Sequence, residues 1–382
     1  MKKVLWISLS APYDSVAHAG GKTENYYVKG TKKNDVDLRI LSFALEHERA
    51  KVDLEQYGIE YDIKFYPDNF CRQMKMVDIY RYSIRAVKKY KREGYTPDVI
   101  VLQWTQIAFL IGIIKKIFPN AKYIVVEEDV TFLAYRRFYQ YYRNPIKKLM
   151  FYLMYHVVKC LELKSVCMSD RTVCSNEKDK KLLWETGIDK QKVINIVPYY
   201  QNMSDVEYKG ESKDIIFYGA MGRMENHMSA VWFLENVFPK IKDQSVRFLV
   251  IGGGPKDELR TYESERVKIM GFVDDLTPYF SNGLCLAAPL QLGAGIKVKI
   301  LEAMSAGLPV VTNAIGIEGI SAIDGKDYLF ATTADEYVES INRLLNEEKL
   351  KYKLSDSAKM YLERDFNLQE KLKVFTDLIE RI

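Results

Sequence analysis

The sequence predicts an α/β protein of two domains, each built on a largely parallel sheet. At 382 residues the chain is long enough for two hydrophobic cores. Residues 284–311 read as strand, glycine loop, helix and strand, which is a βαβ unit. Residues 198–213 are polar and have no hydrophobic period, as expected of a linker. We therefore expect domains at 1–197 and 214–362, with a further helix at 363–382.

The first strand is expected at residues 4–9. Three residues with two lysines precede it, but the apolar run is short and no small-residue cleavage site follows, so a strand is favoured over a signal peptide. The next loop ends in Gly20 and Gly21, and a helix is expected at 23–33. A glycine pair after the first strand of an α/β domain can face a bound ligand, although a plain turn explains it equally well.

Further strands of the first domain are expected at 38–43, 61–65, 99–103 and 122–126, with helices at 72–93 and 107–118. The strand at 122–126 runs directly into Glu127, Glu128 and Asp129. Carboxylates at the carboxyl end of a parallel strand point into the crevice where α/β proteins bind ligands. Alternatively, Asp129 simply caps the helix that follows.

Residues 134–164 combine seven basic side chains and eight aromatic rings with one acid, Glu162. Pro145 is expected to split the segment into two helices. Interleaved cations and rings suit the surface of an anionic membrane. A helix pair with its rings turned inward is the alternative, and no nucleic-acid-binding module is recognisable. The basic residues expected to contact lipid are Arg136, Arg137, Arg143, Lys147 and Lys148.

The remaining elements follow the same alternation of short apolar runs and amphipathic stretches. In the first domain they are strands at 170–175 and 193–197 with a helix at 177–184. In the second domain, strands are expected at 215–218, 247–251, 284–288 and 308–311, and helices at 228–238, from 298 onward, and at 334–346, 349–361 and 368–382.

Three glycine turns in the second domain each follow a strand, and together they indicate a phosphate-binding crevice. They lie at 219–222, 252–254 and 293–295. The third opens a helix, whose free N–H groups and dipole favour an anion. Lys297 and Lys299 stand in its first turn, where cations oppose the dipole unless an anion is bound. They would otherwise be ordinary solvated lysines.

Residues 293–311, GAGIKVKILEAMSAGLPVV, resemble the donor-site signature of the family 4 retaining glycosyltransferases. In that family the second of two glutamates holds the nucleotide ribose, and this role carries over to Glu302. The first glutamate, which contacts the donor sugar, is replaced by Ala294. An arginine and a lysine that bind phosphate are replaced by Ala220 and Asn226. The resemblance therefore implies that Lys297, with Lys299 as the second candidate, neutralises the diphosphate.

The resemblance also implies the other donor contacts. They would come from Gly20, Gly21, Asn226, Gly254, Phe272, Val273, Gly293, Gly295 and Ile296. Phe272 could equally be a core residue. Lys297 would be the catalytic cation, and Glu128 and Asp129 would lie near the reacting groups. The implied fold is GT-B, two Rossmann-like domains facing across a cleft, with the last helix crossing back to the first domain.

The activity implied is transfer of a sugar from a nucleotide-sugar, on family frequency a UDP-sugar, to a glycan or lipid-linked acceptor. No metal and no other cofactor is expected. The expected setting is surface polysaccharide synthesis of the bacterial type, with a cytoplasmic protein peripheral to the inner face of the cell membrane and no nucleic-acid partner. A GT-B sugar-nucleotide epimerase and a non-catalytic nucleotide-sugar-binding subunit are the alternatives.

Composition sets further bounds on the class of protein. The net charge of +5 conceals a basic first half and an acidic second half. A basic surface suits an acidic partner, although solvated lysines give the same balance. No apolar stretch reaches the 18 residues that indicate a membrane-spanning helix. Five cysteines without paired spacing argue against a disulfide framework or a zinc site, and buried free thiols are expected.

Overall fold

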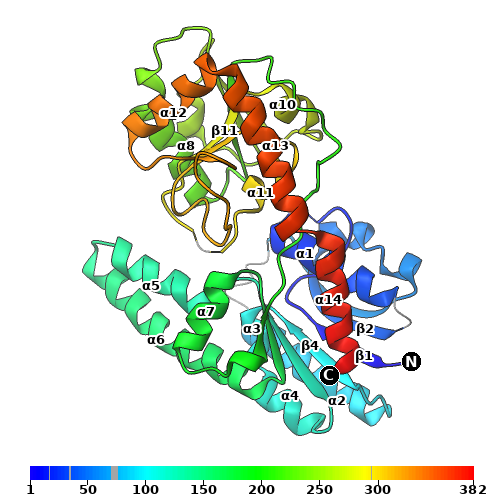
Figure 1. Cartoon of the computed structure of the whole chain (residues 1–382). Coiled ribbons are helices and arrows are strands. Elements are labelled where there is room, and N and C mark those ends of the chain that lie inside the picture. Colours follow the sequence, from blue (N-terminus) through cyan, green and yellow to red (C-terminus); the bar gives the residue numbers. More distant parts are fainter. Residues whose placement is uncertain (17, 34–35, 70–75, 294) are drawn as a thin grey trace. The chain divides into compact units, whose positions relative to one another are not determined.

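The computed structural model describes residues 1–16, 18–33, 36–69, 76–293 and 295–382. The chain divides into two compact units (Figure 1). The first unit contains Met1–Tyr199 together with Leu368–Ile382, and the second contains Tyr200–Asn367. Each unit is a Rossmann-like α/β domain on a parallel sheet, so the predicted fold class is confirmed.

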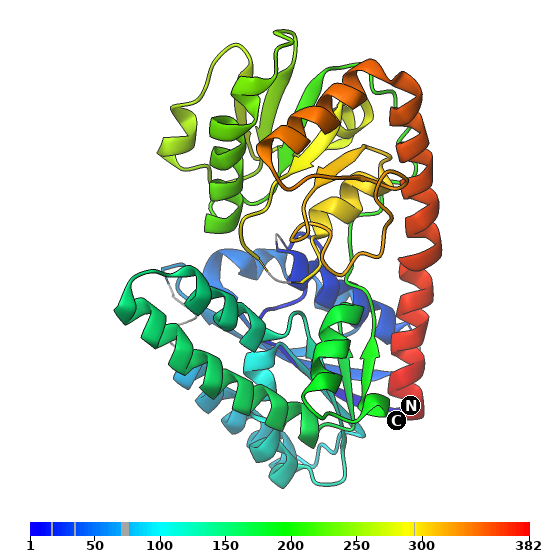
Figure 2. The same ribbon diagram turned by 60° about the vertical axis from the view of Figure 1, so that its left-hand side comes forward.

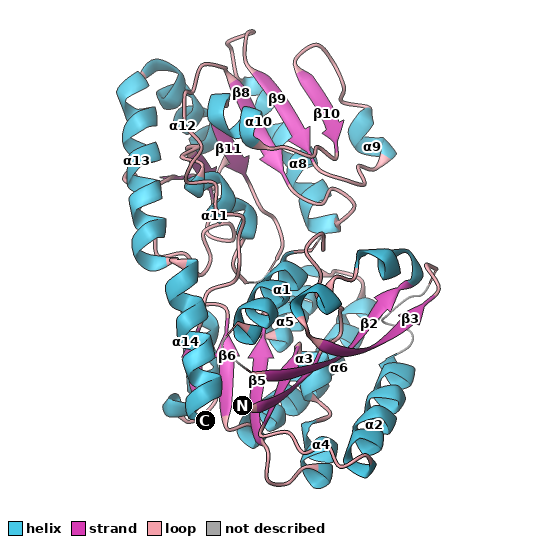
Figure 3. Ribbon diagram, turned by 90° about the vertical axis from the view of Figure 1, so that its right-hand side faces the viewer, coloured by secondary structure: helices cyan, strands magenta, loops and turns pink. Residues whose placement is uncertain are grey.

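The first unit has a seven-stranded parallel sheet in the order β3-β2-β1-β4-β5-β6-β7 (Figure 3). Apart from Lys3 and Gln103 at their ends, the central strands β1 and β4 are apolar, because helices cover both faces of the sheet. The strands are β1 Lys3–Ile7, β2 Asp37–Leu45, β3 Glu60–Tyr66, β4 Val99–Gln103, β5 Lys122–Glu127, β6 Arg171–Cys174 and β7 Val193–Asn195.

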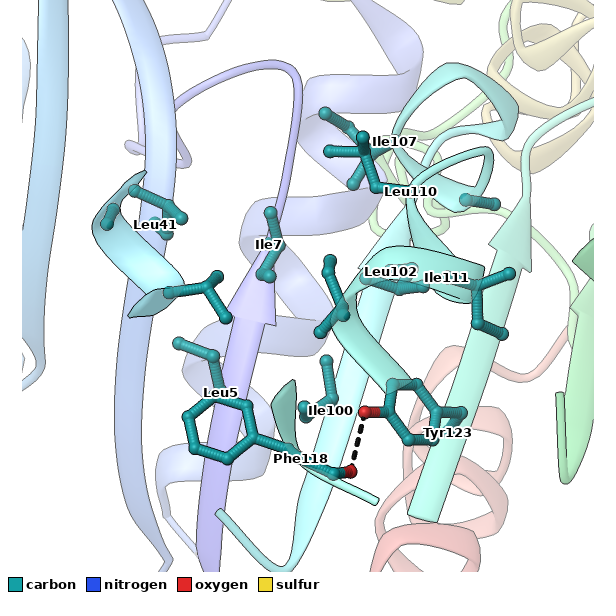
Figure 4. Packing of buried hydrophobic residues seen from close by; sticks show 14 of the residues in the cluster. Leu5, Ile7, Leu41, Ile100, Leu102, Ile107, Leu110, Ile111, Phe118 and Tyr123 are labelled. Carbon is teal, nitrogen blue, oxygen red and sulfur yellow. Dashed lines mark hydrogen bonds between the residues drawn. The ribbon is translucent and has the colours of Figure 1, made fainter. Parts of the chain in front are cut away.

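Two layers of apolar side chains hold this sheet. On one face Leu5, Ile7, Ile100 and Leu102 belong to one buried cluster with residues of helices α2 to α4. Figure 4 shows these four side chains with Ile107 of α3 and Ile111 of α4. The helices of the unit are α1 Ala19–Lys32, α2 Met76–Arg92, α3 Thr105–Ala108, α4 Ile111–Ile117, α5 Thr131–Tyr141, α6 Pro145–Met168, α7 Glu177–Glu185 and α14 Leu368–Arg381, with 3-10 turns at Glu46–Lys51, Leu54–Tyr57 and Lys190–Lys192.

The last helix, α14, completes the opposite face of the first sheet. The ring of Phe375 lies 5.7 Å from that of Trp6 and 4.9 Å from that of Tyr27, between centroids. Leu372 and Ile379 join the same buried cluster. The predicted return of the C-terminal helix to the first domain is thus confirmed.

The second unit has a six-stranded parallel sheet in the order β10-β9-β8-β11-β12-β13. Strands β10 and β13 and the short helices α9 and α10 were not predicted, because none has a long apolar run. The strands are β8 Asp214–Tyr218, β9 Arg247–Ile251, β10 Val267–Gly271, β11 Cys285–Ala288, β12 Val310–Thr312 and β13 Leu329–Phe330. The helices are α8 Met224–Asn236, α9 Asp257–Arg260, α10 Thr277–Asn282, α11 Val298–Ser305, α12 Ala334–Asn346 and α13 Glu348–Asp365, with a 3-10 turn at Phe238–Lys240.

Several local predictions need correction. Gly20 and Gly21 lie in the first turn of α1, which begins at Ala19 and not after the pair. The helix expected at 107–118 is two helices, because the Leu110 N–H bonds the Ile107 carbonyl three residues back and interrupts the α pattern. Of the cysteines expected to be buried, Cys160 and Cys167 are exposed.

Candidate functional site

The carboxyl ends of β8, β9 and β10 are joined by hydrogen bonds between glycine turns. The N–H of Gly219 donates to Ile251 O at 3.0 Å, and that of Gly252 donates to Gly271 O at 2.7 Å. Met221 N–H donates to Gly253 O at 2.8 Å. The first two predicted turns therefore form one continuous floor beside β11, where the strand order reverses from β8 to β11. Ligands of open α/β sheets bind at such a reversal.

Residue 252 must be glycine because its backbone lies very close to that of Gly219 in the neighbouring turn of the floor. A Cβ atom built on Gly252 would lie 1.8 Å from the carbonyl oxygen of Gly219, and the φ angle of Gly252 is 140°. Only glycine fits both restrictions. Gly254, with φ 72°, lies against Gly222 in the same way. These glycines keep the floor free of side chains.

Lys299 extends from the first turn of α11 to this floor. Its Nζ donates a hydrogen bond of 2.6 Å to Asn226 Oδ1, and Asn226 Nδ2 donates to Ala220 O at 2.9 Å. A Cβ on Gly219 would lie 2.7 Å from the same Nζ. The pKa of Lys299 is lowered to about 7, first by burial and then by the positive charges of Lys297 and Arg223.

Lys297 has a different environment, because it occupies the N-cap position of α11. Its Nζ donates to Gly295 O at 2.6 Å and lies 4.0 Å from a carboxylate oxygen of Glu318. A Cβ on Gly293 would lie 3.1 Å from Lys297 Cε. Lys297 therefore closes the third glycine loop onto the helix. Ala294 lies outside the described residues, and Ile296, directly before Lys297, is half-buried.

Glu302 lies one turn further along α11 and is 3% exposed. The backbone N–H of Gln201 donates to its Oε1 at 3.4 Å. The hydroxyl of Tyr218, at the end of β8, hydrogen bonds with the same carboxylate. Burial, followed by the negative charge of Glu302, raises the pKa of Tyr218. The carboxylate is thus oriented beside the floor by groups from two other segments.

The predicted base-contact segment follows β10. Phe272 is 75% exposed, which excludes the alternative that it is a core residue. Val273 beside it is half-buried. A Cβ on Gly253 would lie 3.8 Å from the Cβ of Phe272, so the Phe272 side chain begins at the edge of the glycine floor. Arg223, the displaced arginine of the first turn, is exposed and forms an ion pair of 2.6 Å with Glu225.

In the first unit, the acidic residues after β5 are buried or half-buried. Gln103 Nε2 donates to Glu128 Oε1 at 2.6 Å, and burial, followed by Asp129 and Glu24, raises the pKa of Glu128 well above its ordinary value. The pKa of Glu127 is raised to about 8, mainly by burial. These carboxyls lie at the end of the sheet where ligands bind in such folds.

Asp129 does not cap the following helix. The first N–H groups of α5, those of Thr131 and Phe132, donate to the two carboxylate oxygens of Glu162 at 2.7 and 2.9 Å. Glu162 belongs to α6 and is fully buried. The capping alternative is therefore wrong, because a side chain distant in sequence satisfies these donors.

Trp104, directly after β4, explains why residue 20 is glycine. Its φ angle of 76° is positive, which among the described residues is shared only by glycines. A Cβ on Gly20 would lie 2.2 Å from the Trp104 ring, and one on Gly21 would lie 2.7 Å from the His18 ring. The indole N–H donates to Glu24 at 3.4 Å. The glycine pair thus has a packing reason, and its predicted ligand contact stays a prediction.

The two helices split at Pro145 are confirmed, with the Asn144 side chain capping α6 at Ile146 and Lys147. Most of the rings that the sequence placed at a membrane surface pack between α5 and α6 instead. Phe151 of α6 contacts rings of three α5-side residues, Tyr135, Phe138 and Tyr142, at 5.2 to 6.4 Å between centroids. The five basic residues stay wholly or partly exposed.

No described helix is both long enough and apolar enough to cross a membrane. No group of three or more His, Cys, Asp and Glu side chains suited to hold a metal ion is present in the described ranges.

The sequence of the second unit matches a known protein family. Residues 212–347 match the family model described as glycosyl transferases group 1, so the second unit contains a glycosyltransferase group 1 domain. A curated relative, an uncharacterized 44.6 kDa protein in the cps region of Klebsiella pneumoniae, is 27% identical over 129 residues. That alignment covers 31% of this chain, and the chain spans about a third (33%) of the relative's length.

Solved glycosyltransferase structures share the whole fold. Sucrose-phosphate synthase from Thermosynechococcus elongatus aligns with a TM-score of 0.76 at 12% identity, over 100% of this chain and 99% of that one. HepE of Anabaena, solved in complex with UDP, aligns over 100% of both chains with a TM-score of 0.70 at 12% identity. WaaG, a glycosyltransferase involved in lipopolysaccharide biosynthesis, aligns over 99% of this chain and 100% of its own with a TM-score of 0.70 at 11% identity. The chain has the GT-B fold.

Sequence reasoning found the glycine turns, both lysines and Glu302, but missed their partners. Glu318, beside Lys297, lies between Gly316 and Gly319, and this position near two glycines was a usable signal. Tyr218 and Gln201 carry no motif, and only the fold brings them to Glu302.

Proposed function

We propose that this protein is a glycosyltransferase that moves a sugar from a UDP-sugar to a glycan or lipid-linked acceptor, with retention at the anomeric carbon. The observation that carries the proposal is the second unit's glycine floor, with Lys299 and Glu302 of α11 beside it. Bare backbone, a helix N-terminus, a cation and an oriented carboxylate are what a nucleoside diphosphate requires. HepE is known in complex with UDP-glucose, which supports the choice of donor.

The residue roles follow from the same contacts. Glu302 would accept hydrogen bonds from the ribose hydroxyls in place of the Gln201 N–H. The exposed Phe272 and the neighbouring Val273 would hold the base. Charge that develops on the departing diphosphate would be met by a lysine and by the first N–H groups of α11.

Of the two lysines, we assign the phosphate contact to Lys299. The sequence assigned it to Lys297, but Lys297 Nζ is bonded to its own loop at Gly295 O and lies near Glu318. Lys299 instead reaches the turn of Ala220 and Asn226, where the family places its two phosphate-binding cations. Lys297 would hold the loop closed over the donor.

The proposed setting is surface polysaccharide synthesis at the cytoplasmic face of a membrane. The match to a protein of a cps region and the fold shared with a lipopolysaccharide glycosyltransferase support this setting. The Glu128 and Gln103 pair at the end of β4 and β5 would contact the acceptor. No metal or other cofactor enters this scheme.

A panel of nucleotide-sugars tests the proposal. The donor should raise the melting temperature of the purified protein, since a ligand that binds only the folded state stabilises it. Incubation with that donor should then release the nucleoside diphosphate and extend a lipid-linked or glycan acceptor. Conversion of the donor to an epimer without an acceptor would instead establish the epimerase alternative. Binding without any turnover would establish a non-catalytic subunit.

A further inference from the structure

The outer side of α6 is an uninterrupted aliphatic face. Ile146, Leu149, Leu153 and Val157 are 78, 58, 56 and 58% exposed, and Met150, Met154 and Leu161 are exposed beside them. Their spacing of three and four residues places all seven along one side of the helix. The face runs about 22 Å along the helix axis. Soluble proteins rarely leave so many contiguous apolar side chains in water.

The inner side of α6 packs against α5 and holds the helix in place, so the outer side is not needed for folding. Three residues of α6 face α5. Phe151 and Tyr155 contact aromatic rings of α5, and Glu162 caps the first turn of α5. Figures 1 and 2 show α5 and α6 running side by side as one pair. The exposed aliphatic face therefore has no partner among the described residues.

The charges around this face are all of one sign. Arg143, Lys147 and Lys148 are exposed at the start of α6, and Lys164 is exposed beyond its aliphatic end. The single acidic residue of the helix, Glu162, is fully buried. No exposed carboxylate of α6 could therefore pair with a cation of a partner.

We propose that the aliphatic face of α6 docks the protein on an anionic lipid surface, with the aliphatic side chains in the acyl boundary and with Lys147, beside the face, and Lys164, at its end, among the headgroups. Amphipathic helices that lie in the membrane interface combine these two features. A second copy fits less well, since pairing two such faces would bring lysines against lysines in either direction. The proposal rests on the proposed function, because a lipid-linked acceptor would bring the protein to a membrane.

This surface differs from the one that the sequence suggested. The sequence favoured rings together with basic residues, whereas most of those rings lie inside the helix pair. In this proposal the aliphatic residues carry the contact instead, and the lipid contact expected of the five basic residues stays a prediction.

Sedimentation of the full chain with vesicles tests the proposal. The vesicles contain phosphatidylcholine alone or phosphatidylcholine with phosphatidylglycerol. The triple variant Leu149→Ser/Leu153→Ser/Val157→Ser should bind the anionic vesicles at least about tenfold more weakly, because each methylene group that is buried contributes a factor of about four. The matched control Val77→Ser/Met360→Ser/Val374→Ser changes exposed apolar residues on other helices and should bind as wild type.

The charge component has its own pair of variants. Lys147→Gln/Lys164→Gln should weaken binding to the anionic vesicles by about 30-fold at low salt, because each basic residue contributes a factor of about five. Lys349→Gln/Lys353→Gln, at exposed positions of α13, should have no effect.

Two results would overturn the docking proposal. One is an unexpected vesicle result: either wild type does not sediment with anionic vesicles, or the serine variant binds them as well as wild type does. The other is that lipid-free wild type is a dimer by analytical ultracentrifugation and the serine variant a monomer, which would assign the face to a second copy. Titration of UDP on the same samples separates the docking proposal from the proposed function. If wild type binds the vesicles but not UDP, the donor site is contradicted and the docking proposal is not.

Discussion

Lys299 Nζ lies 2.6 Å from Asn226 Oδ1, so a lysine of α11 is fixed to the first turn of α8. The same amide group donates to Ala220 O. These are the two positions at which the resembled family carries its phosphate-binding arginine and lysine. A cation therefore reaches this turn, but it comes from a different helix.

Lys299→Gln should lower the turnover rate more than Lys297→Gln. Removing a single preorganised donor to a developing charge typically costs about 10²–10³ in rate. If the contact acts mainly in the transition state, the turnover rate should fall more than donor affinity does. Steady-state kinetics of both variants beside wild type would check this. A normal rate for Lys299→Gln with an inactive Lys297→Gln would restore the assignment made from the sequence.

Nucleotide binding should weaken as the pH rises above about 7. The pKa of Lys299 is lowered to about 7, so the amine loses its charge above that pH. A bound diphosphate favours the protonated form, and binding must then take up a proton. Affinity should therefore fall by up to about tenfold per pH unit. Calorimetric titration of UDP between pH 6 and pH 9, in buffers of different ionisation enthalpy, measures both affinity and proton uptake.

The control for this pH dependence is Lys299→Met, which removes the titrating group. Its affinity should be weaker at pH 6 and nearly flat across the same range. An unchanged slope in Lys299→Met would assign the titration to another group, such as the nucleotide itself.

Glu302→Ala should weaken UDP binding by roughly 1.5–3 kcal/mol, the range for a lost charge-assisted hydrogen bond. Because Glu302 also bonds Tyr218 and the Gln201 N–H, the variant's melting temperature must be measured together with its affinity. Glu363→Ala, at an exposed site of α13, is the matched control. Unchanged UDP affinity in a folded Glu302→Ala protein would contradict the ribose role. Titration with 2′-deoxy-UDP offers a second check, because wild type and variant should then differ less.

Gly252→Ala should destabilise the protein far more than Gly325→Ala. Both glycines have positive φ angles, and at Gly325 no atom lies within 4 Å of the added Cβ. The cost at Gly325 should thus be the left-handed backbone alone, about 1–2 kcal/mol. At Gly252 the methyl group would meet the Gly219 carbonyl, so the floor must move. Urea denaturation of both variants measures the difference, and equal midpoints would show that the floor yields easily.

The sequence was sufficient for the parallel architecture because its central strands are continuous apolar runs. β1, β4 and β11 were recognisable for this reason, and so was α12, whose bounds match the prediction at 334–346. β13 has two residues and β10 alternates buried with exposed positions, so neither gives a strong signal. Local turns such as the one between α3 and α4 depend on packing that no single segment encodes.

For the candidate site, residue types were easier to predict than their partners. A glycine loop followed by lysines indicates an anion site in any α/β protein. Which lysine reaches which turn depends on the direction of α11 relative to α8, and this is a property of the folded domain. The rings of residues 135–155 show the same limit, since composition alone does not decide which side of a helix faces water.

The position of α14 sets a condition on how the chain is made. Phe375 packs against Trp6 and Tyr27, so the first sheet acquires part of its core only when residues 368–382 have been added. During synthesis from the N-terminus, the interval between Tyr199 and Leu368 is filled by the whole second unit. The first unit is therefore completed only after the residues of the second unit have been made, and Trp6 has to wait for Phe375 before its ring is covered.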